Sequence, residues 1–154
     1  MSLDIGQPAP DFTMPTDGGG TVGLRDLRGK TVVLYFYPKD DTSGCTAEAC
    51  GFRDALPDYS GIDAVVIGVS RDSVASHDKF KGKHGLTFTL ASDEDGAVCE
   101  RYGTWVEKSM YGRKYMGVDR ATFLIDREGI LRAIWRKVKV PGHVAEVLKA
   151  AKGL

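Results

Sequence analysis

Two apolar segments with a helical segment between them constrain the fold of this chain more than any other feature. The segments Val32–Tyr37 and Asp63–Ser70 are nearly continuous runs of β-branched, aromatic and other apolar residues. Such runs are typical of strands that are buried on both faces of a sheet. The residues from about Ser43 to Leu56 predict a helix that stops at Pro57. A strand, a helix and a strand in this order predict a parallel pair with a right-handed crossover.

The remaining segments extend this unit to an α/β layer fold. A glycine-rich turn at residues 17–20 separates two short strand-like segments, which predicts an N-terminal β-hairpin over residues 12–24. The other predicted elements are helices over residues 73–84, 96–102 and about 141–152, and strands over residues 121–125 and 130–137. Together they predict a mixed central sheet with helices on both faces. With 154 residues we expect a single domain, 1–154, whose core needs no disulfides.

Charge and cysteine content exclude several classes of protein. Lys plus Arg and Asp plus Glu both number 21, so no global field attracts nucleic acid or an anionic membrane. The N-terminal segment carries Asp4 and no apolar core, so it does not resemble a signal peptide, and no apolar run is long enough to span a bilayer. Three cysteines do not make a secreted disulfide framework, so we expect a cytoplasmic protein.

Cys45 and Cys50 form the chemically most informative pair of residues. Cys45 lies where the first strand gives way to the helix, and Cys50 follows five residues later. A thiol at a helix start is favoured as the thiolate, because the helix dipole stabilises negative charge there. In an intact helix the two Cα atoms would be about 8–9 Å apart, whereas a disulfide needs about 7 Å or less. A disulfide between them would therefore require the start of the helix to unwind.

The helix also carries an apolar stripe that begins at Cys45. Cys45, Ala49, Phe52 and Leu56 follow one another at helical spacing. This stripe predicts that Cys45 lies at the N-terminal tip of the buried face. That position is the crevice outside the carboxyl ends of parallel strands, where open α/β sheets usually bind ligands.

Several motifs of the chain resemble those of the peroxiredoxins. Pro38, Thr42 and Cys45 match the Pro-x-x-x-Thr-x-x-Cys signature, and Cys50 resembles the second cysteine of the bacterioferritin comigratory protein (peroxiredoxin Q) subfamily. Further matches lie at residues 6–12, 33–39, 92–95, 102–108 and 120–126. The resemblance covers nearly all of the chain and implies a thioredoxin-like fold. The chain departs from the pattern at Ser43, where proline is common, and we expect this serine to cap the helix.

The resemblance implies a role for each matching residue. Cys45 would be the peroxidatic cysteine, whose thiolate attacks the peroxide and becomes a sulfenic acid. Arg120 would hold the thiolate and the peroxide oxygens, because a guanidinium stays charged and donates in several directions. Thr42 would orient the peroxide through its hydroxyl, and Pro38 would shield the thiolate from water. The backbone N–H groups of Gly44 and Cys45 would stabilise charge on the departing oxygen.

The resemblance also implies how the enzyme turns over. Cys50 is similar to the resolving cysteine, which would form an intramolecular disulfide that thioredoxin then reduces. The substrates would be hydrogen peroxide and organic hydroperoxides, and the protein would be a monomer that needs no cofactor. Glu48, three residues after Cys45, lies on nearly the same side of the helix. Two interpretations of Glu48 stay open: it holds Arg120, or it is a solvent-exposed helix carboxylate.

Two other function classes remain alternatives. A thiol–disulfide oxidoreductase on the same fold is the first, although four residues separate Cys45 from Cys50 where that class uses Cys-x-x-Cys. The second is a non-enzymatic module whose helix unwinds on oxidation and thereby changes an interaction. Direct consumption of peroxide distinguishes the peroxidase from the oxidoreductase, and turnover with a reductant distinguishes it from the module.

The remaining chemically interesting residues favour structural interpretations. We expect Cys99 to be a buried core residue and not a backup resolving thiol. The three histidines complete no metal-ligand cluster, so we predict no metal site and place His77, His84 and His143 on the surface. Trp105, Tyr111 and Tyr115 are more consistent with ordinary packing than with a pocket for organic hydroperoxides. The acidic segment Asp93–Asp95 is predicted to be a solvated turn that caps a helix.

Overall fold

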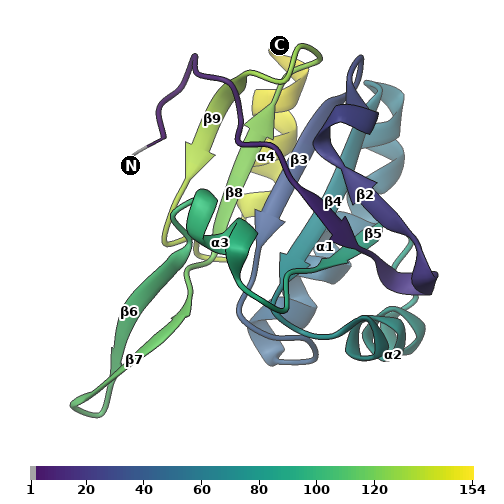
Figure 1. The fold of residues 1–154 in the computed structure, drawn as a ribbon. Helices are drawn as coiled ribbons and strands as arrows, with labels where there is room; N and C mark the ends of the chain where they lie inside the picture. The colour runs from purple at the N-terminus through teal and green to yellow at the C-terminus, as the bar shows by residue number, and fades with distance from the viewer. Residues whose placement is uncertain (1–2) are drawn as a thin grey trace.

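A five-stranded mixed sheet forms the centre of the protein (Figure 1). The computed structural model describes residues 3–154. The strand order is β5-β4-β3-β8-β9. The strands are β3 (Thr31–Phe36), β4 (Ala64–Ser70), β5 (Thr89–Ser92), β8 (Ala121–Ile125) and β9 (Leu131–Trp135). Strand β4 pairs in parallel with β3 and β5, whereas β8 pairs antiparallel with β3 and β9. The predicted parallel centre is confirmed.

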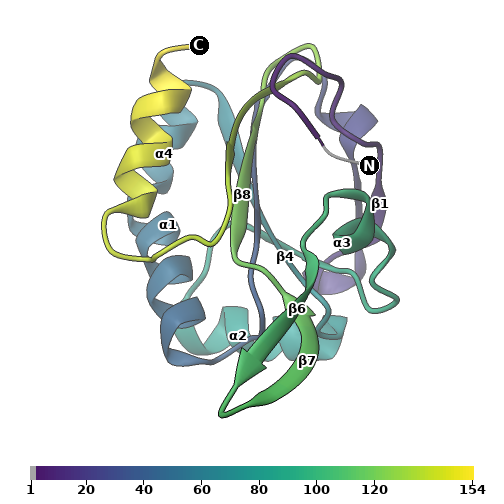
Figure 2. The ribbon, with the colours of Figure 1, turned by 90° about the vertical axis from the view of Figure 1, so that its left-hand side faces the viewer.

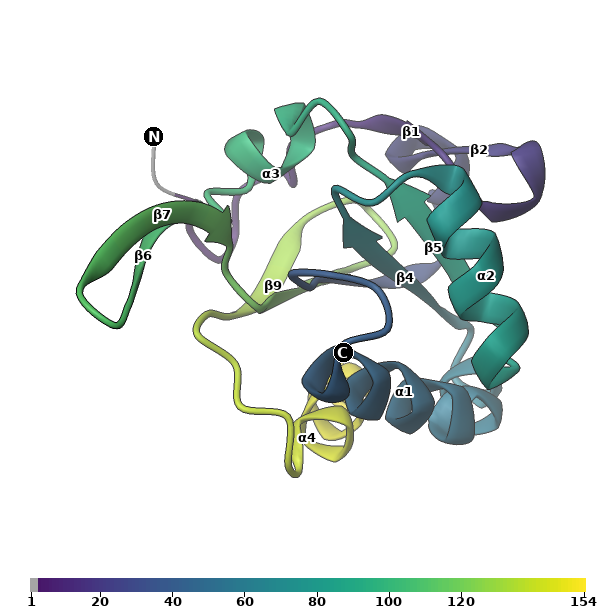
Figure 3. The ribbon, with the colours of Figure 1, turned by 90° about the horizontal axis from the view of Figure 1, so that it is seen from below.

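Helices cover both faces of this sheet (Figure 2). Helices α1 (Ser43–Gly61) and α4 (His143–Lys152) lie on one face. The short helix α3 (Ala97–Arg101) and the N-terminal hairpin of β1 (Thr13–Pro15) and β2 (Thr21–Gly23) lie on the other. Helix α2 (Val74–His84) packs beside β5 at the edge of the sheet (Figure 3). Two 3-10 turns, Asp17–Gly19 and Leu24–Leu27, adjoin the hairpin. Within residues 3–154, no helix has the length and apolar character that crossing a membrane requires.

The two faces of β3 explain why its sequence is apolar throughout. All six residues of this central strand are buried. Val32 and Leu34 belong to the core beneath the N-terminal hairpin and α3, whereas Val33 and Tyr35 belong to the core beneath α1 and α4. Successive side chains of a strand point to opposite faces, so both sets must be apolar when both faces are covered.

Helix α1 is longer than the sequence predicts. It continues through Pro57 to Gly61, so the prediction that Pro57 ends it is wrong. Proline inside a helix costs about 3 kcal/mol because it lacks an N–H and crowds the preceding turn. Packing outweighs this cost: Tyr59 is fully buried, and its hydroxyl donates a 2.8 Å hydrogen bond to the carbonyl of Val144 in the first turn of α4.

Other boundaries also differ from the predictions. Helix α4 begins at His143 and not near Pro141, because Gly142, with a φ of 78°, occupies the N-cap position. The sequence pattern predicted neither β5 nor the hairpin of β6 (Trp105–Met110) and β7 (Arg113–Val118). This hairpin projects from the body of the protein (Figure 1) and is largely exposed, so its residues lack the apolar pattern of a buried strand.

Candidate active site

Cys45 lies in the first turn of α1, just beyond the end of the central strand β3. Its side chain is 1% exposed and packs in the core beneath α1 and α4. The N-cap residue of α1 is Thr42, not Ser43, so the expectation that Ser43 caps the helix is wrong. The Thr42 hydroxyl donates a 2.9 Å hydrogen bond to the carbonyl of Lys39, within the loop that leads into the helix. The predicted position of Cys45 at the helix tip is confirmed.

Arg120 reaches Cys45 because of the register between two strands. Strand β8 runs antiparallel to β3, and Ala121 at its start pairs with Phe36 at the end of β3. Arg120, the residue before β8, therefore lies beside the end of β3, from which the chain leads into α1. Its Nη2 atom lies 3.4 Å from Cys45 Sγ. This contact joins residues that are 75 positions apart in the sequence.

Glu48 holds the other end of the Arg120 guanidinium. Arg120 Nη1 lies 2.6 Å from Glu48 Oε1. The Glu48 side chain is completely buried, so the interpretation as a solvent-exposed carboxylate is wrong. Burial raises the pKa of Glu48 to about 7, although the charge and hydrogen bond of Arg120 act to lower it. Among the described residues, Glu48 Oε2 has no hydrogen-bond partner.

Gly44 allows Arg120 to approach the start of α1 closely. A Cβ atom at residue 44 would lie 3.2 Å from Arg120 Nη2, the same nitrogen that contacts Cys45. Any larger residue would therefore compete with the guanidinium for this space. Pro38 lies half-buried in the same loop. The structure thus brings the predicted residues Pro38, Thr42, Gly44, Cys45, Glu48 and Arg120 to one end of the sheet.

The three cysteines differ in their surroundings, and all have free thiols. Cys50 is half-buried on α1. Cys99 is fully buried beneath the N-terminal hairpin, where burial raises the pKa of its thiol. The expectation that Cys99 is a core residue is confirmed. Asp93 is also buried and accepts hydrogen bonds from the backbone N–H groups of Val98 and Cys99, so it caps α3 as expected but is not solvated.

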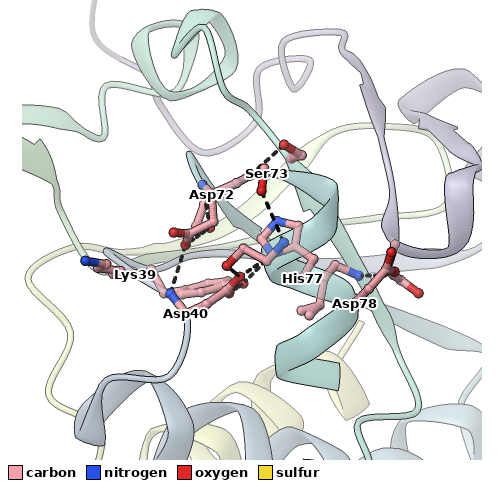
Figure 4. A network of polar contacts seen from close by, with 12 residues as sticks. Lys39, Asp40, Asp72, Ser73, His77 and Asp78 are labelled. Atoms are coloured by element: carbon pink, nitrogen blue, oxygen red, sulfur yellow. Dashed lines mark hydrogen bonds and ion pairs between the residues drawn. The ribbon is translucent and has the colours of Figure 1, made fainter. Parts of the chain in front are cut away.

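The histidines do not lie on the surface as the sequence analysis expected. His77 is fully buried and His143 is 4% exposed, and only His84 is partly accessible. His143 Nε2 lies 2.8 Å from the Thr122 hydroxyl. His77 faces Asp40, a residue of the loop before α1 that sequence reasoning did not single out (Figure 4). The helical spacing of His77 and the buried Phe80 on α2 is the signal that could have predicted its burial.

The aromatic residues of the projecting hairpin differ in their surroundings: Trp105 is partly buried against the core, whereas Tyr111 and Tyr115 are exposed. Tyr111 is 97% exposed and Tyr115 is also exposed. Trp105 lies beneath the guanidinium of Arg71, whose carbon is 4.3 Å from the ring centre. The expectation of ordinary packing is therefore wrong for the two tyrosines. Within residues 3–154, no group of His, Cys, Asp and Glu is arranged to hold a metal ion.

Comparison with known proteins shows which family the chain belongs to. Residues 5–134 match the AhpC/TSA family. The putative peroxiredoxin bcp of Coxiella burnetii is 59% identical over 148 residues, which cover 96% of this chain and 98% of that protein. Peroxiredoxin Bcp of Bacillus subtilis is 52% identical over 154 residues, covering 100% of this chain and 98% of that protein. The chain belongs to the peroxiredoxin family.

A solved structure extends the similarity to the whole peroxiredoxin fold. The bacterioferritin comigratory protein of Xanthomonas campestris, studied for its alkyl peroxide reduction activity, is similar with a TM-score of 0.91 and 44% identity. The similarity covers 97% of this chain and 98% of that one. The thioredoxin-like fold that the sequence motifs implied is therefore confirmed. As a peroxiredoxin the protein is a thiol peroxidase.

Proposed function

We propose that this peroxiredoxin reduces hydrogen peroxide and organic hydroperoxides at Cys45, resolves the product with Cys50 and is recycled by thioredoxin. The observation that carries the proposal is the 3.4 Å contact between Arg120 Nη2 and Cys45 Sγ at the start of a helix. A guanidinium and a helix N-terminus both favour a negatively charged sulfur. The alkyl peroxide activity studied in the Xanthomonas campestris relative supports the inclusion of organic hydroperoxides.

In the first step the Cys45 thiolate attacks the terminal oxygen of the peroxide. A sulfur–oxygen bond forms, the oxygen–oxygen bond breaks, and the departing oxygen takes a proton to leave as water or an alcohol. Arg120 donates to the sulfur and the peroxide oxygens, and the Thr42 hydroxyl orients the peroxide. The backbone N–H groups of Gly44 and Cys45 stabilise the departing oxygen, while Pro38 keeps water from the thiolate. Glu48 fixes the guanidinium through its 2.6 Å contact.

In the second step the Cys50 thiolate attacks the sulfur of the Cys45 sulfenic acid. A disulfide forms, the sulfur–oxygen bond breaks, and the departing hydroxide takes a proton from solvent to leave as water. The helical spacing of the two residues requires the first turn of α1 to unwind for this step. Two features support low stability there: the Thr42 side chain forms no capping hydrogen bond, and the first turn holds no acidic residue. A dithiol such as thioredoxin then reduces the disulfide in the cytoplasm, with the peroxiredoxin acting as a monomer.

A coupled assay tests the proposed function. Purified protein is mixed with thioredoxin, thioredoxin reductase, NADPH and either hydrogen peroxide or an alkyl hydroperoxide. We expect NADPH consumption that depends on peroxide and is abolished by Cys45→Ser, whereas Cys99→Ser is the matched control that keeps it. A protein that reduces model disulfides but consumes no peroxide would contradict the proposal and favour the thiol–disulfide oxidoreductase.

A further inference from the structure

A buried ion pair joins α2 to the loop between β3 and α1 (Figure 4). His77 Nδ1 of α2 lies 2.7 Å from Asp40 Oδ2, and the two side chains are 0% and 4% exposed. The other ring nitrogen, Nε2, lies 2.9 Å from the carbonyl oxygen of Ala91. Neither His77 nor Asp40 takes part in the chemistry proposed above.

The hydrogen-bond partners fix the charges of this pair. The Ala91 carbonyl can only accept, so His77 Nε2 carries a hydrogen. Asp40 accepts from the hydroxyls of Tyr37 (2.6 Å) and Ser76 (2.8 Å) in addition to facing His77. With two hydroxyl donors already directed at it, Asp40 matches an ionised carboxylate, which can only accept, so His77 Nδ1 is also a donor. His77 is therefore an imidazolium.

The electrostatics agree with this assignment. Burial acts to lower the pKa of His77, but the hydrogen bond and charge of Asp40 outweigh it and raise that pKa, with smaller contributions from the Ala91 carbonyl and Asp72. For Tyr37, burial has the opposite effect and raises the pKa of the hydroxyl, so Tyr37 stays a neutral donor. The groups that face His77 from the surrounding elements thus favour its charged form.

Asp40 is held through its backbone as well as its side chain. Its N–H donates a 2.8 Å hydrogen bond to Asp72 Oδ2, and Asp72 itself accepts a 2.6 Å hydrogen bond from the Ser70 hydroxyl at the end of β4. Asp40 lies midway between Pro38 and Thr42 in the sequence. Asp40, which is buried against α2, is thus two positions from each of the two loop residues to which the proposed function gives a role at the peroxide.

We propose that the Asp40–His77 ion pair is a positioning element that holds residues 38–42 in the conformation needed for peroxide reduction. A buried ion pair seldom stabilises a fold more than apolar residues of the same volume, so stability alone does not account for it. Fixing the loop aims the Thr42 hydroxyl and the Pro38 ring at a peroxide in front of Cys45. This inference rests on the proposed function of Cys45.

The neighbouring residue Asp41 supplies a matched control. Asp41 also joins the loop to α2, through contacts with Lys83 (2.8 Å) and His84 (3.1 Å), but this cluster is solvent-exposed. Exposed ion pairs contribute little. We therefore expect Asp41→Asn to change the peroxide reaction of Cys45 less than about twofold. We expect Asp40→Asn to slow it by about 10- to 100-fold, the effect of a small misplacement of reacting groups.

Two reagents separate positioning from general damage to the fold. The rate constant of Cys45 is measured by stopped flow with hydrogen peroxide and, separately, with iodoacetamide. Alkylation needs neither the Thr42 hydroxyl nor the Pro38 ring, so Asp40→Asn should keep the iodoacetamide rate or raise it. Equal losses with both reagents, or an unchanged peroxide rate, would overturn the proposal.

A pair of His77 variants tests the ion pair independently and serves if Asp40→Asn does not fold. Glutamine and leucine have similar volumes, but only glutamine can donate to Asp40. We expect His77→Gln to react with peroxide at least fivefold faster than His77→Leu, whatever their order of thermal stability. If the two variants react equally fast, or if His77→Leu reacts faster, His77 is only a core residue. Wild-type protein that consumes no peroxide would instead refute the proposed function itself.

Discussion

The buried carboxyl group of Glu48 makes a quantitative prediction for the variant Glu48→Gln. Burial raises the pKa of Glu48 to about 7 from an ordinary value of 4.5. The folded protein therefore holds this proton more tightly than the unfolded chain. The stabilisation that follows is fully present below pH 4.5 and is lost as the pH rises through about 7. At about 1.4 kcal/mol per unit, the loss between pH 5 and pH 8 is about 2–3 kcal/mol.

Glu48→Gln removes this titration but keeps an oxygen that accepts from Arg120. Urea denaturation of both proteins at pH 5 and pH 8 gives the four free energies of unfolding that are needed. From pH 5 to pH 8, we expect the free energy of unfolding of the variant to rise by about 2–3 kcal/mol relative to that of the wild type. The peroxide reaction of Cys45 should nevertheless slow, because Arg120 loses the anionic partner that fixes it.

The exposed residue Glu107 provides the control for this experiment. Its side chain is 62% exposed on β6, and its partner Lys114 is also exposed, so Glu107→Gln removes a carboxylate without altering a buried ion pair. The reasoning would be refuted if the free energies of unfolding of the wild type and of Glu48→Gln changed between pH 5 and pH 8 by the same amount, within about 1 kcal/mol. Burial would then not dominate the ionisation of Glu48.

Three further substitutions test individual contacts. Cys50→Ser should trap the Cys45 sulfenic acid, detectable by dimedone labelling and mass spectrometry, and unchanged disulfide turnover would point to another resolving thiol. Gly44→Ala places a methyl group 3.2 Å from Arg120 Nη2 and should slow the peroxide reaction about tenfold, as a displaced guanidinium implies. Arg120→Lys keeps the charge but cannot contact Cys45 and Glu48 together. Stopped flow should show that Arg120→Lys slows the peroxide reaction about as much as Gly44→Ala does. A wild-type rate in either variant would contradict the importance of the contact between Arg120 and Cys45.

The sequence predicted the elements whose signals are local. Strands β3 and β4 and the start of α1 follow from continuous apolar runs and a helical stripe, which act over a few residues. The end of α1 was not predictable in the same way, because Tyr59 packing against Val144 lies 85 residues away in the sequence. Local rules for Pro57 therefore failed where a distant contact outweighed them.

The residues of the site also differ in whether their positions depend on local or on non-local interactions. The position of Cys45 follows from the strand-to-helix junction, but the arrival of Arg120 depends on the register of β8 against β3. That register is non-local, and only the family resemblance implied it. Helical spacing places Glu48 at the edge of the buried stripe, so spacing alone does not predict its burial. In the structure the Glu48 side chain is buried together with its ion-pair partner Arg120. Asp40 and His77 were missed because each looks ordinary alone and only their 2.7 Å contact reveals the pair.

Peptide mapping after a single oxidation tests the central claim most directly. The reduced protein receives one equivalent of hydrogen peroxide, is blocked with an alkylating reagent and is digested for mass spectrometry. We predict rapid, selective formation of a Cys45–Cys50 disulfide while Cys99, fully buried in the core, remains a free thiol. Peroxide that persists while all three thiols stay reduced would contradict the account.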